Sequence, residues 1–246
     1  MVRSLLSLVG KEIRGMHQAA YLLALFAFGS QLLALVRDRL LAGTFGASST
    51  LDVYYAAFRI PDLLFATVAS LLSLYALLPV LSKLESDEQM VAFVRESLLV
   101  FFVVMAAISG VLFVLAPLLV PLIAPGVASP ALVMLTRILL LQPILLGASN
   151  VVAALTQLQH RFVLYSISPL LYNLGIIFGV VFLYPHLGLA GLGWGVVLGA
   201  ALHLSVQLPF FKGLRLRASN FGMRKTLAYL RQVLTLSVPR TLALAA

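Results

Sequence analysis

The chain alternates between long apolar stretches and short segments that are polar or rich in proline and glycine. A helix that crosses the hydrocarbon core of a bilayer needs about 20 predominantly apolar residues. Six complete stretches predict membrane-spanning helices, at residues 19–41, 51–81, 98–123, 132–155, 163–183 and 189–211. A seventh apolar stretch begins near Leu227, and we expect the chain to end inside that span.

The second apolar stretch is longer than a bilayer requires and contains charged residues. Asp52, Arg59 and Asp62 lie within it, next to Pro61. Proline lacks the N–H that a helix interior needs, and its ring clashes with the preceding turn. A stretch that is too long also tilts, bends or projects beyond the membrane. The sequence therefore predicts a broken helix in this region.

Composition narrows the class of protein. Apolar residues make up 62% of the chain and charged residues 10%, whereas soluble domains average roughly half apolar and about a quarter charged. A water-soluble fold is therefore excluded, and the predicted class is an all-α, polytopic transmembrane helical bundle. The chain has no cysteine, which excludes disulfides and thiolate metal sites.

The sequence contains no visible catalytic machinery. The cytoplasmic segments lack a carboxylate pair, a nucleophile next to a base, and a glycine-rich phosphate loop. His160, His186 and His203 are not spaced as metal ligands. We therefore predict that the protein is not an enzyme and that it uses no metal or other cofactor.

The distribution of cations predicts the orientation of the chain. The loops at 43–49, 124–129 and 185–188 contain no Lys or Arg, whereas the segments on the opposite side contain twelve. Because translocation of cationic segments is disfavoured, the side with the cations is cytoplasmic. We therefore predict a multi-pass protein of the cytoplasmic membrane with a cytoplasmic amino terminus. The twelve cations are Arg3, Lys11, Arg14, Lys83, Arg95, Arg161, Lys212, Arg215, Arg217, Arg224, Lys225 and Arg231.

The predicted organisation has four segments. Residues 1–18 form a cytoplasmic amphipathic lead-in, 19–211 the transmembrane region, 212–226 a basic cytoplasmic linker, and 227–246 the start of the seventh span. The stretch 212–231 carries six cations and no acid. It suits an amphipathic helix on an anionic membrane surface, or it only anchors the topology. Nucleic-acid binding is disfavoured because the topology already explains these charges.

Ionisable residues inside the membrane are the main functional candidates, because such groups are costly there and usually face a bundle interior or a wet cavity. Helical spacing puts Asp52 and Arg59 seven residues apart and Arg59 and Asp62 three apart, so we expect these three to share one face. Guanidinium groups on facing helices would suit a diphosphate, through bidentate hydrogen bonds. The first span contributes Gln31, Arg37, Asp38 and Arg39 to this set.

A structural interpretation of the same charges stays open. Arg37, Asp38 and Arg39 would then extend to the outer interface, and Arg59 would pair with Asp52 or Asp62 to hold the first two helices together. Arg137, near the outer end of the fourth span, could extend to the interface in the same way.

Small residues and prolines predict features of helix packing. Glycines recur at four-residue spacing in the fifth and sixth spans, which allows close helix contact in lipid. We favour contact within one bundle over a dedicated dimer interface. Pro143 and Pro169 should kink or interrupt their helices. The glycines are Gly175, Gly179, Gly191, Gly195 and Gly199.

The segment 32–66 resembles the amino-terminal signature of the lipid II flippase family, MurJ/MviN. The matching features are Arg37-Asp38, the turn Phe45-Gly46-Ala47, Asp52 with Tyr54 and Tyr55, and Arg59-Ile60-Pro61-Asp62. The similarity continues through Pro79, Ala124-Pro125-Gly126, residues 168–174, and Gly199 to Pro209.

The resemblance implies a multidrug/oligosaccharidyl-lipid/polysaccharide exporter fold, in which two helical lobes enclose a cationic cavity that alternates between the membrane faces. The chain resembles one lobe, of about six helices plus the start of a seventh, so a carboxyl-terminal lobe is an expected partner. The implied function is movement of lipid-linked peptidoglycan precursor (lipid II) from the inner to the outer leaflet, for cell-wall biosynthesis.

The chain departs from the family pattern at two positions. Gln31 and Phe65 stand where the family usually has arginines that are expected to contact the diphosphate. We predict that Arg37, Arg39 and Arg59 contact the diphosphate, and that Asp38, Asp52, Asp62 and Gln31 orient or pair with them. The alternatives are an exporter of another polyprenyl-diphosphate-linked oligosaccharide, and a non-transporting membrane scaffold.

Overall fold

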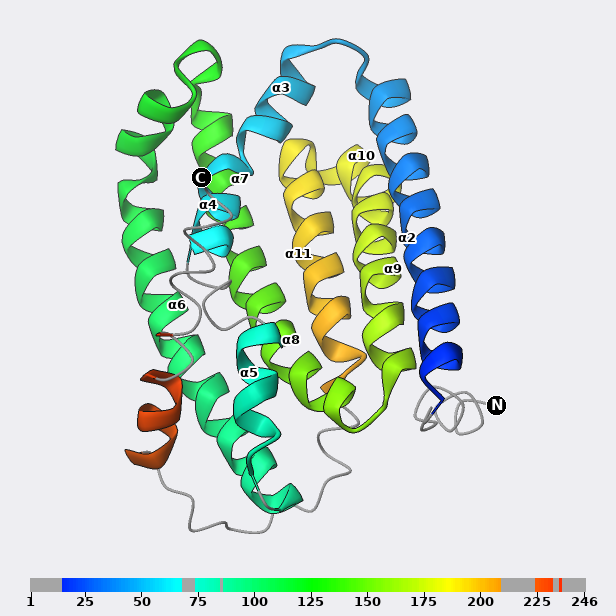
Figure 1. The fold of residues 1–246 in the computed structure, drawn as a ribbon. Coiled ribbons are helices and arrows are strands. Elements are labelled where there is room, and N and C mark those ends of the chain that lie inside the picture. Colours follow the sequence, from blue (N-terminus) through cyan, green and yellow to red (C-terminus); the bar gives the residue numbers. More distant parts are fainter. Residues whose placement is uncertain (1–14, 68–73, 85, 209–223, 232–234, 236–246) are drawn as a thin grey trace.

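The computed structural model describes residues 15–67, 74–84, 86–208, 224–231 and 235, and every regular element in these ranges is a helix (Figure 1). The predicted all-α class is confirmed. The elements are α2 (Met16–Phe45), α3 (Ser49–Ala56), α4 (Arg59–Thr67), α5 (Leu74–Leu81), α6 (Asp87–Ile123), η2 (Pro125–Val127), α7 (Pro130–Leu139), α8 (Leu141–Leu158), α9 (Phe162–Phe178), η3 (Gly179–Leu183), α10 (Tyr184–Leu187) and α11 (Leu189–Ser205).

Four helical segments in the described ranges are long and apolar enough to cross a membrane. Helix α2 corresponds to the first predicted span, α6 to the third, α7 with α8 to the fourth, and α9 to α10 to the fifth. The sixth span is represented by α11, which is a shorter apolar helix of 17 residues. Most of the predicted seventh span lies outside the described residues. The four segments are His17–Phe45, Glu88–Ile123, Pro130–Leu158 and Phe162–Leu187.

The predicted break in the second span is confirmed. Helix α3 ends at Ala56 and α4 begins at Arg59. The ring of Pro61 would clash with the carbonyl of Ala57, four residues earlier, if the helix continued. Because Pro61 lies in the first turn of α4, its missing N–H costs no helical hydrogen bond there.

Proline also explains why the fourth span consists of two helices. Helix α7 ends at Leu139, four residues before Pro143, and α8 begins two residues later. This spacing repeats the arrangement of Ala57 and Pro61, because the proline ring again excludes the carbonyl four residues earlier from a regular helix. Pro169 behaves differently, since it lies within the uninterrupted helix α9.

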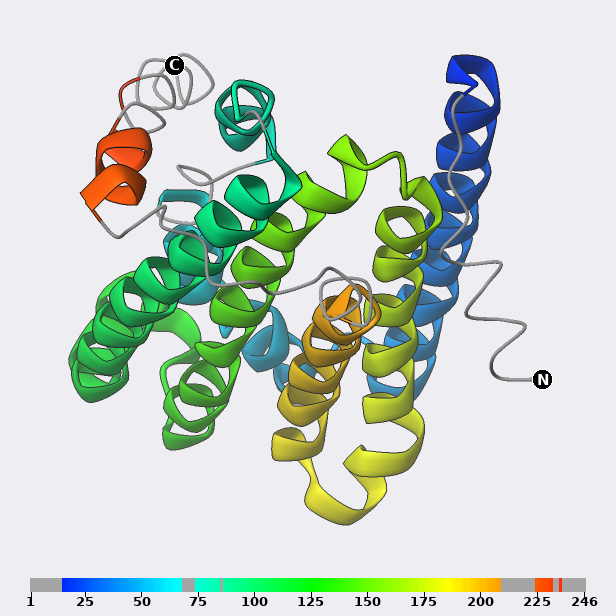
Figure 2. The ribbon, with the colours of Figure 1, turned by 90° about the horizontal axis from the view of Figure 1, so that it is seen from below.

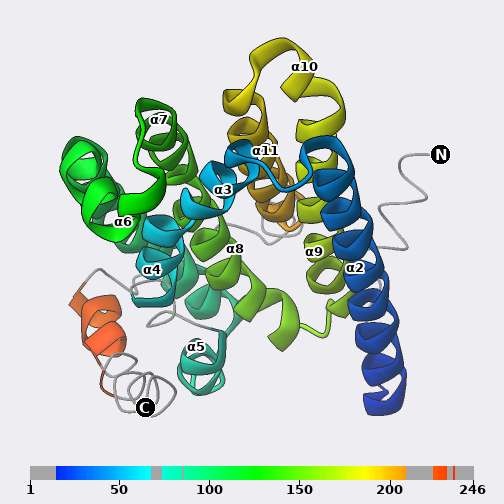
Figure 3. The ribbon, with the colours of Figure 1, turned by 90° about the horizontal axis from the view of Figure 1, so that it is seen from above.

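The helices form a bundle in which α2 and α6 lie at opposite edges (Figure 1). Seen from either end, α9 and α11 stand beside α2, whereas α8 runs between them and α6 (Figures 2 and 3). The segmented pair α3 and α4 crosses the bundle from the end of α2 toward α7 (Figure 3). This crossing brings polar residues of the second span close to those of α2 and α9.

Helices α9 and α11 approach each other through glycine. A Cβ atom added at Gly175 would lie 2.2 Å from the Cα atom of Gly199, and one added at Gly179 would lie 2.5 Å from the Cα atom of Gly195. Real Cβ atoms do not tolerate such distances, so only glycine permits this backbone contact. The predicted glycine packing within one bundle is therefore confirmed.

Residues 224–231 are helical and pack against the amino-terminal part of α6. The hydroxyl of Thr226 donates a hydrogen bond to the carboxylate of Glu96, and the rings of Phe93 and Tyr229 meet edge to face at 6.0 Å. The cations Arg224, Lys225 and Arg231 are exposed. Residues 212–223 of the predicted basic segment lie outside the described residues.

The glycine contact can be tested by adding a side chain. In Gly199→Leu, the new Cβ atom would lie 2.4 Å from the carbonyl oxygen of Tyr172, and overpacking of this kind costs about 1–3 kcal/mol or more. We expect a lower thermal unfolding midpoint for the full-length protein in detergent. Gly43→Leu is the control, because a Cβ atom at Gly43 meets nothing within 4 Å. Equal midpoints for the two variants would contradict the proposed contact.

Candidate functional site

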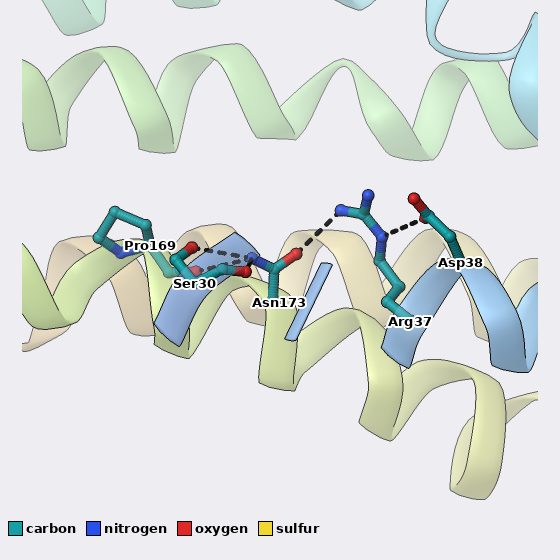
Figure 4. A network of polar contacts seen from close by, with 5 residues as sticks. All are labelled: Ser30, Arg37, Asp38, Pro169 and Asn173. Atoms are coloured by element: carbon teal, nitrogen blue, oxygen red, sulfur yellow. Dashed lines mark hydrogen bonds and ion pairs between the residues drawn. The ribbon is translucent and has the colours of Figure 1, made fainter. Parts of the chain in front are cut away.

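Arg37 is held in place by neighbours on two helices. Its Nε–H donates to Asp38 Oδ1 at 2.8 Å, and its Nη1 donates to Asn173 Oδ1 of α9 at 2.9 Å. The Nδ2 group of Asn173 donates to the backbone oxygens of Ser30 (3.3 Å) and Pro169 (3.2 Å), and to Ser30 Oγ (3.2 Å). Figure 4 shows this chain of contacts from Pro169 to Asp38. Asn173 therefore joins α2 to α9 and fixes the direction of the arginine.

Arg37 and Asp38 line a cavity of about 270 Å³ together with residues of α3, α4 and α9. Asp62 of α4 borders the same cavity, and the side chain of Gln142 lies against its carboxylate. The structure thus brings Arg37, Asp38 and Asp62, polar residues of the first two spans, to one cavity. The remaining lining residues are Leu41, Tyr54, Tyr55, Phe58, Tyr172 and Ile176.

The guanidinium of Arg37 keeps donors free for a ligand. Arginine has five N–H donors in a planar fork, and the contacts to Asp38 and Asn173 involve one N–H on Nε and one on Nη1. The Nη2 atom has no hydrogen-bond partner among the described residues. A guanidinium that is held in position in this way suits two oxygens of a phosphate or carboxylate.

The charge balance of the cavity differs from the expected cationic pocket. Arg37 is the only cation among the described residues that line it, and it stands against the acidic side chains Asp38 and Asp62. With both carboxylates ionised, this part of the chain supplies no excess of positive charge. Any strong preference for a diphosphate therefore requires cations from outside the described cavity.

Arg59 lies apart from Arg37 and does not line the cavity. Its Nη1 donates at 2.7 Å to the carbonyl oxygen of Ile123, the last residue of α6. The last carbonyls of a helix lack helical partners, and a cation is favourable beside them. Arg59 makes no ion pair with Asp52 or Asp62 within the described residues. A face shared by all three requires a continuous helix, and the break at residues 57–58 separates Asp52 on α3 from Arg59 and Asp62 on α4.

Gln31, Arg39 and Asp52 are exposed, and their side chains make no hydrogen bond or ion pair to the rest of the described chain. None of the three lines the cavity. Their predicted roles beside a diphosphate remain predictions. Phe65, which replaces an expected arginine, is partly buried and packs against the hydrophobic core.

Two residues at the site were not singled out from the sequence. Asn173 connects α9 to α2, and Tyr172 lines the cavity beside it. The available signal was an asparagine inside an apolar span, because a polar side chain in lipid needs a partner. The sequence alone did not reveal that the partner was Arg37, since 136 residues separate the two.

A second buried polar network lies between α8, α9 and α11. Ser149 Oγ and His203 Nδ1 are hydrogen-bonded at 2.7 Å, and Gln207 Nε2 donates to Ser149 Oγ (2.7 Å) and Ser168 Oγ (3.2 Å). These hydrogen bonds link α8, α9 and α11, and the buried Oε1 atom of Gln207 has no hydrogen-bond partner within the described residues. Histidine 203 thus has hydrogen-bonding partners of its own, none of which is a typical metal ligand.

Comparisons with known proteins agree with the sequence resemblance. The family model described as lipid II flippase MurJ matches residues 41–246. The lipid II flippase MurJ of Burkholderia cenocepacia is 31% identical over 200 residues, which are 76% of this chain and 38% of the relative. A probable lipid II flippase MurJ of Thermotoga maritima is 30% identical over 192 residues, 77% of this chain and 40% of the relative.

A solved structure described as lipid II flippase MurJ, inward closed conformation, has the same fold, with a TM-score of 0.62 and 23% identity. The match covers 89% of this chain and 47% of that protein. The chain thus spans less than half the length of the proteins it matches.

The link between Arg37 and Asn173 can be measured by a double-mutant cycle. Hydrogen bonds to charged groups contribute about 1.5–3 kcal/mol. We therefore expect Asn173→Leu to lower the free energy of unfolding of the full-length protein in detergent by about that amount, and by less in an Arg37→Leu background. Asn150→Leu on α8 is the control, because Asn150 makes no side-chain hydrogen bond within the described residues. Strictly additive effects of the two substitutions would argue against the link.

Proposed function

The chain belongs to the lipid II flippase MurJ family, and from that premise we propose that it is one lobe of a lipid flippase. The substrate is a lipid-linked peptidoglycan precursor, which moves from the inner to the outer leaflet of the cytoplasmic membrane. The proposal is supported by the family match over residues 41–246 and above all by one observation, a fixed arginine on a cavity between the first two spans.

In this proposal, Arg37 is the diphosphate contact that this lobe contributes. Its free Nη2 group reaches one or two phosphate oxygens, while Asp38 and Asn173 hold the guanidinium in position. Because the two carboxylates beside Arg37 offset its charge, the carboxyl-terminal lobe supplies further cations when both lobes enclose the substrate. Arg39, which is exposed near the same end of α2, is a second contact in the closed assembly.

Arg59 has a different part in the proposed mechanism. It holds the start of α4 to the end of α6 through the Ile123 carbonyl. Because it does not line the Arg37 cavity, it would reach a diphosphate bound there only if α4 moved. We therefore assign Arg59 to positioning the second span. Asp52 and Gln31 remain proposed orienting residues.

A related transporter is the second candidate. Gln31 and Phe65 replace two arginines that the family pattern leads one to expect, and the cavity carries two carboxylates for one cation. A different polyprenyl-diphosphate-linked oligosaccharide would fit this altered charge set. In both cases the protein acts as a transporter and catalyses no covalent chemistry.

Native mass spectrometry of the full-length protein with undecaprenyl-diphosphate-linked precursor tests the role of Arg37. We expect Arg37→Gln to bind the precursor at least about tenfold more weakly, since a charge-assisted bidentate contact is lost. Lys83→Gln, which removes a cation from an exposed loop position, should bind as the wild type does.

Folding is checked by the thermal midpoint of each variant. If folded Arg37→Gln bound the precursor as tightly as the wild type, the proposed contact would be refuted. If the wild type bound the precursor no better than undecaprenyl phosphate, another substrate or a scaffold function would replace the proposal.

Single cysteines test the proposed orientation, because this chain contains no cysteine of its own. In a full-length protein without other cysteines, Gly126→Cys should react with a membrane-impermeant maleimide in intact cells. Lys83→Cys should react only after permeabilisation. Gly126 has open space around its missing side chain, and Lys83 is exposed, so both sites tolerate the change. The reverse pattern would place the amino terminus outside.

A further inference from the structure

A large apolar groove lies on a different part of the bundle from the Arg37 cavity, and the two share no lining residue. The groove has a volume of about 1020 Å³ and is bordered by α6, the short loop before α7, α7 itself, the start of α8, and Trp194 of α11. That volume is at the upper limit of typical ligand pockets, roughly 300–1,000 Å³. Helices α6 and α7 lie on the side of the bundle away from α2 (Figure 3).

Among the described residues that line the groove, Arg137 is the only charged one. The two serines in the lining are already engaged, since Ser109 donates to the carbonyl of Leu140 and Ser129 accepts from the N–H of Leu132. The other lining side chains are apolar. The groove therefore combines an extended apolar wall with a single cation.

The position of Arg137 is fixed by the helix that it faces. Pro117 has no N–H, so the carbonyl of Phe113, four residues earlier, lacks its helical partner. The Nε–H of Arg137 donates to that carbonyl at 3.0 Å, and the guanidinium carbon lies 4.7 Å from the centre of the Phe113 ring. Both Nη groups have no hydrogen-bond partner within the described chain, so they stay available to a ligand.

Arg137 is seven residues from the start of α7 at Pro130, which corresponds to about 10 Å along the helix axis. The charge pattern of the loops predicts that this end of α7 is the outer end. A lipid headgroup at the outer surface is therefore within reach of the guanidinium, while a chain attached to it would lie along the apolar wall.

We propose that this groove binds one anionic phospholipid of the surrounding membrane. Its phosphate contacts the Nη groups of Arg137, and an acyl chain lies between α6 and α7. A single fixed cation above an apolar wall complements the charge and shape of such a lipid. A zwitterionic lipid carries an ammonium group that the lone cation repels. The proposal does not depend on the transported substrate, because the groove is separate from the Arg37 cavity.

Trp194 provides a direct reporter, since it lines the groove and is the only tryptophan of the chain. The full-length protein, with any tryptophan outside this chain replaced by phenylalanine, is reconstituted in phosphatidylcholine. Brominated-acyl phosphatidylglycerol or brominated-acyl phosphatidylcholine is then added at equal mole fractions. We expect phosphatidylglycerol to quench Trp194 at about fivefold lower mole fraction, the factor expected for one arginine near a membrane surface.

Three variants separate the contributions of charge and space. Arg137→Gln keeps a donor for the Phe113 carbonyl but removes the charge, so the preference for phosphatidylglycerol should disappear. Arg137→Lys should retain most of it. Gly110→Leu fills the groove where a Cβ atom meets nothing within 4 Å, and it should reduce quenching by both lipids. Lys83→Gln is the charge control, on an exposed loop far from the groove in sequence, and should behave as the wild type.

Several results would overturn the proposal. Equal quenching of the wild type by the two brominated lipids would exclude a site selective for anionic lipid. The same conclusion follows if Arg137→Gln, folded by its thermal midpoint, retains the preference. Should Arg137→Gln fail to fold, unchanged quenching in Gly110→Leu would still refute the site. Relief of quenching by the lipid-linked precursor at lower concentration than by unlabelled phosphatidylglycerol would assign the groove to the substrate instead.

Discussion

The constraint on which this structure depends is the need to satisfy every backbone carbonyl inside a membrane, where water cannot do so. A proline or a helix end leaves a carbonyl without a helical donor, and an arginine of a neighbouring helix replaces that donor at two places on α6. Arg137 bonds to the Phe113 carbonyl released by Pro117, and Arg59 bonds to the Ile123 carbonyl at the end of α6. Two of the intramembrane arginines are thus anchored to the backbone of one helix, which limits how far either can move toward a ligand.

Arg37 differs from these two arginines because side chains, and no backbone carbonyl, hold it. Asp38 and Asn173 accept from Nε and Nη1 of its guanidinium, and the Nη2 group is left without a hydrogen-bond partner among the described residues. Its position therefore depends on the contact between α2 and α9. Helix α9 is in turn held to α11 by glycines that leave no room for a side chain. The direction of the Arg37 guanidinium is therefore set by contacts that connect α2, α9 and α11.

Much of the fold could be predicted from the sequence because hydrophobic length and proline act locally. The break before Arg59 follows from Pro61, and the contact of α9 with α11 follows from glycines at four-residue spacing. The site was less accessible to prediction. Spacing on a continuous helix grouped Asp52 with Arg59 and Asp62, but the break that the same sequence predicted separates Asp52 from the other two. The pairing of Arg37 with Asn173 is a tertiary contact, and no local pattern encodes the partner.

The charge balance of the cavity bears on how two lobes could alternate between membrane faces. Under the proposed function, one arginine beside two carboxylates would hold an anion only weakly in this lobe alone. Cations from a second lobe would make binding strong only when both lobes close on the substrate. Under the proposed function, helices α2, α9 and α11 would move as one unit in such a change, because the Asn173 link and the glycine contacts join them. The break at residues 57–58 supplies the change in direction, since its backbone is not part of either flanking helix. We therefore expect closure to take place at the break in the second span, while α2, α9 and α11 stay together as a rigid group.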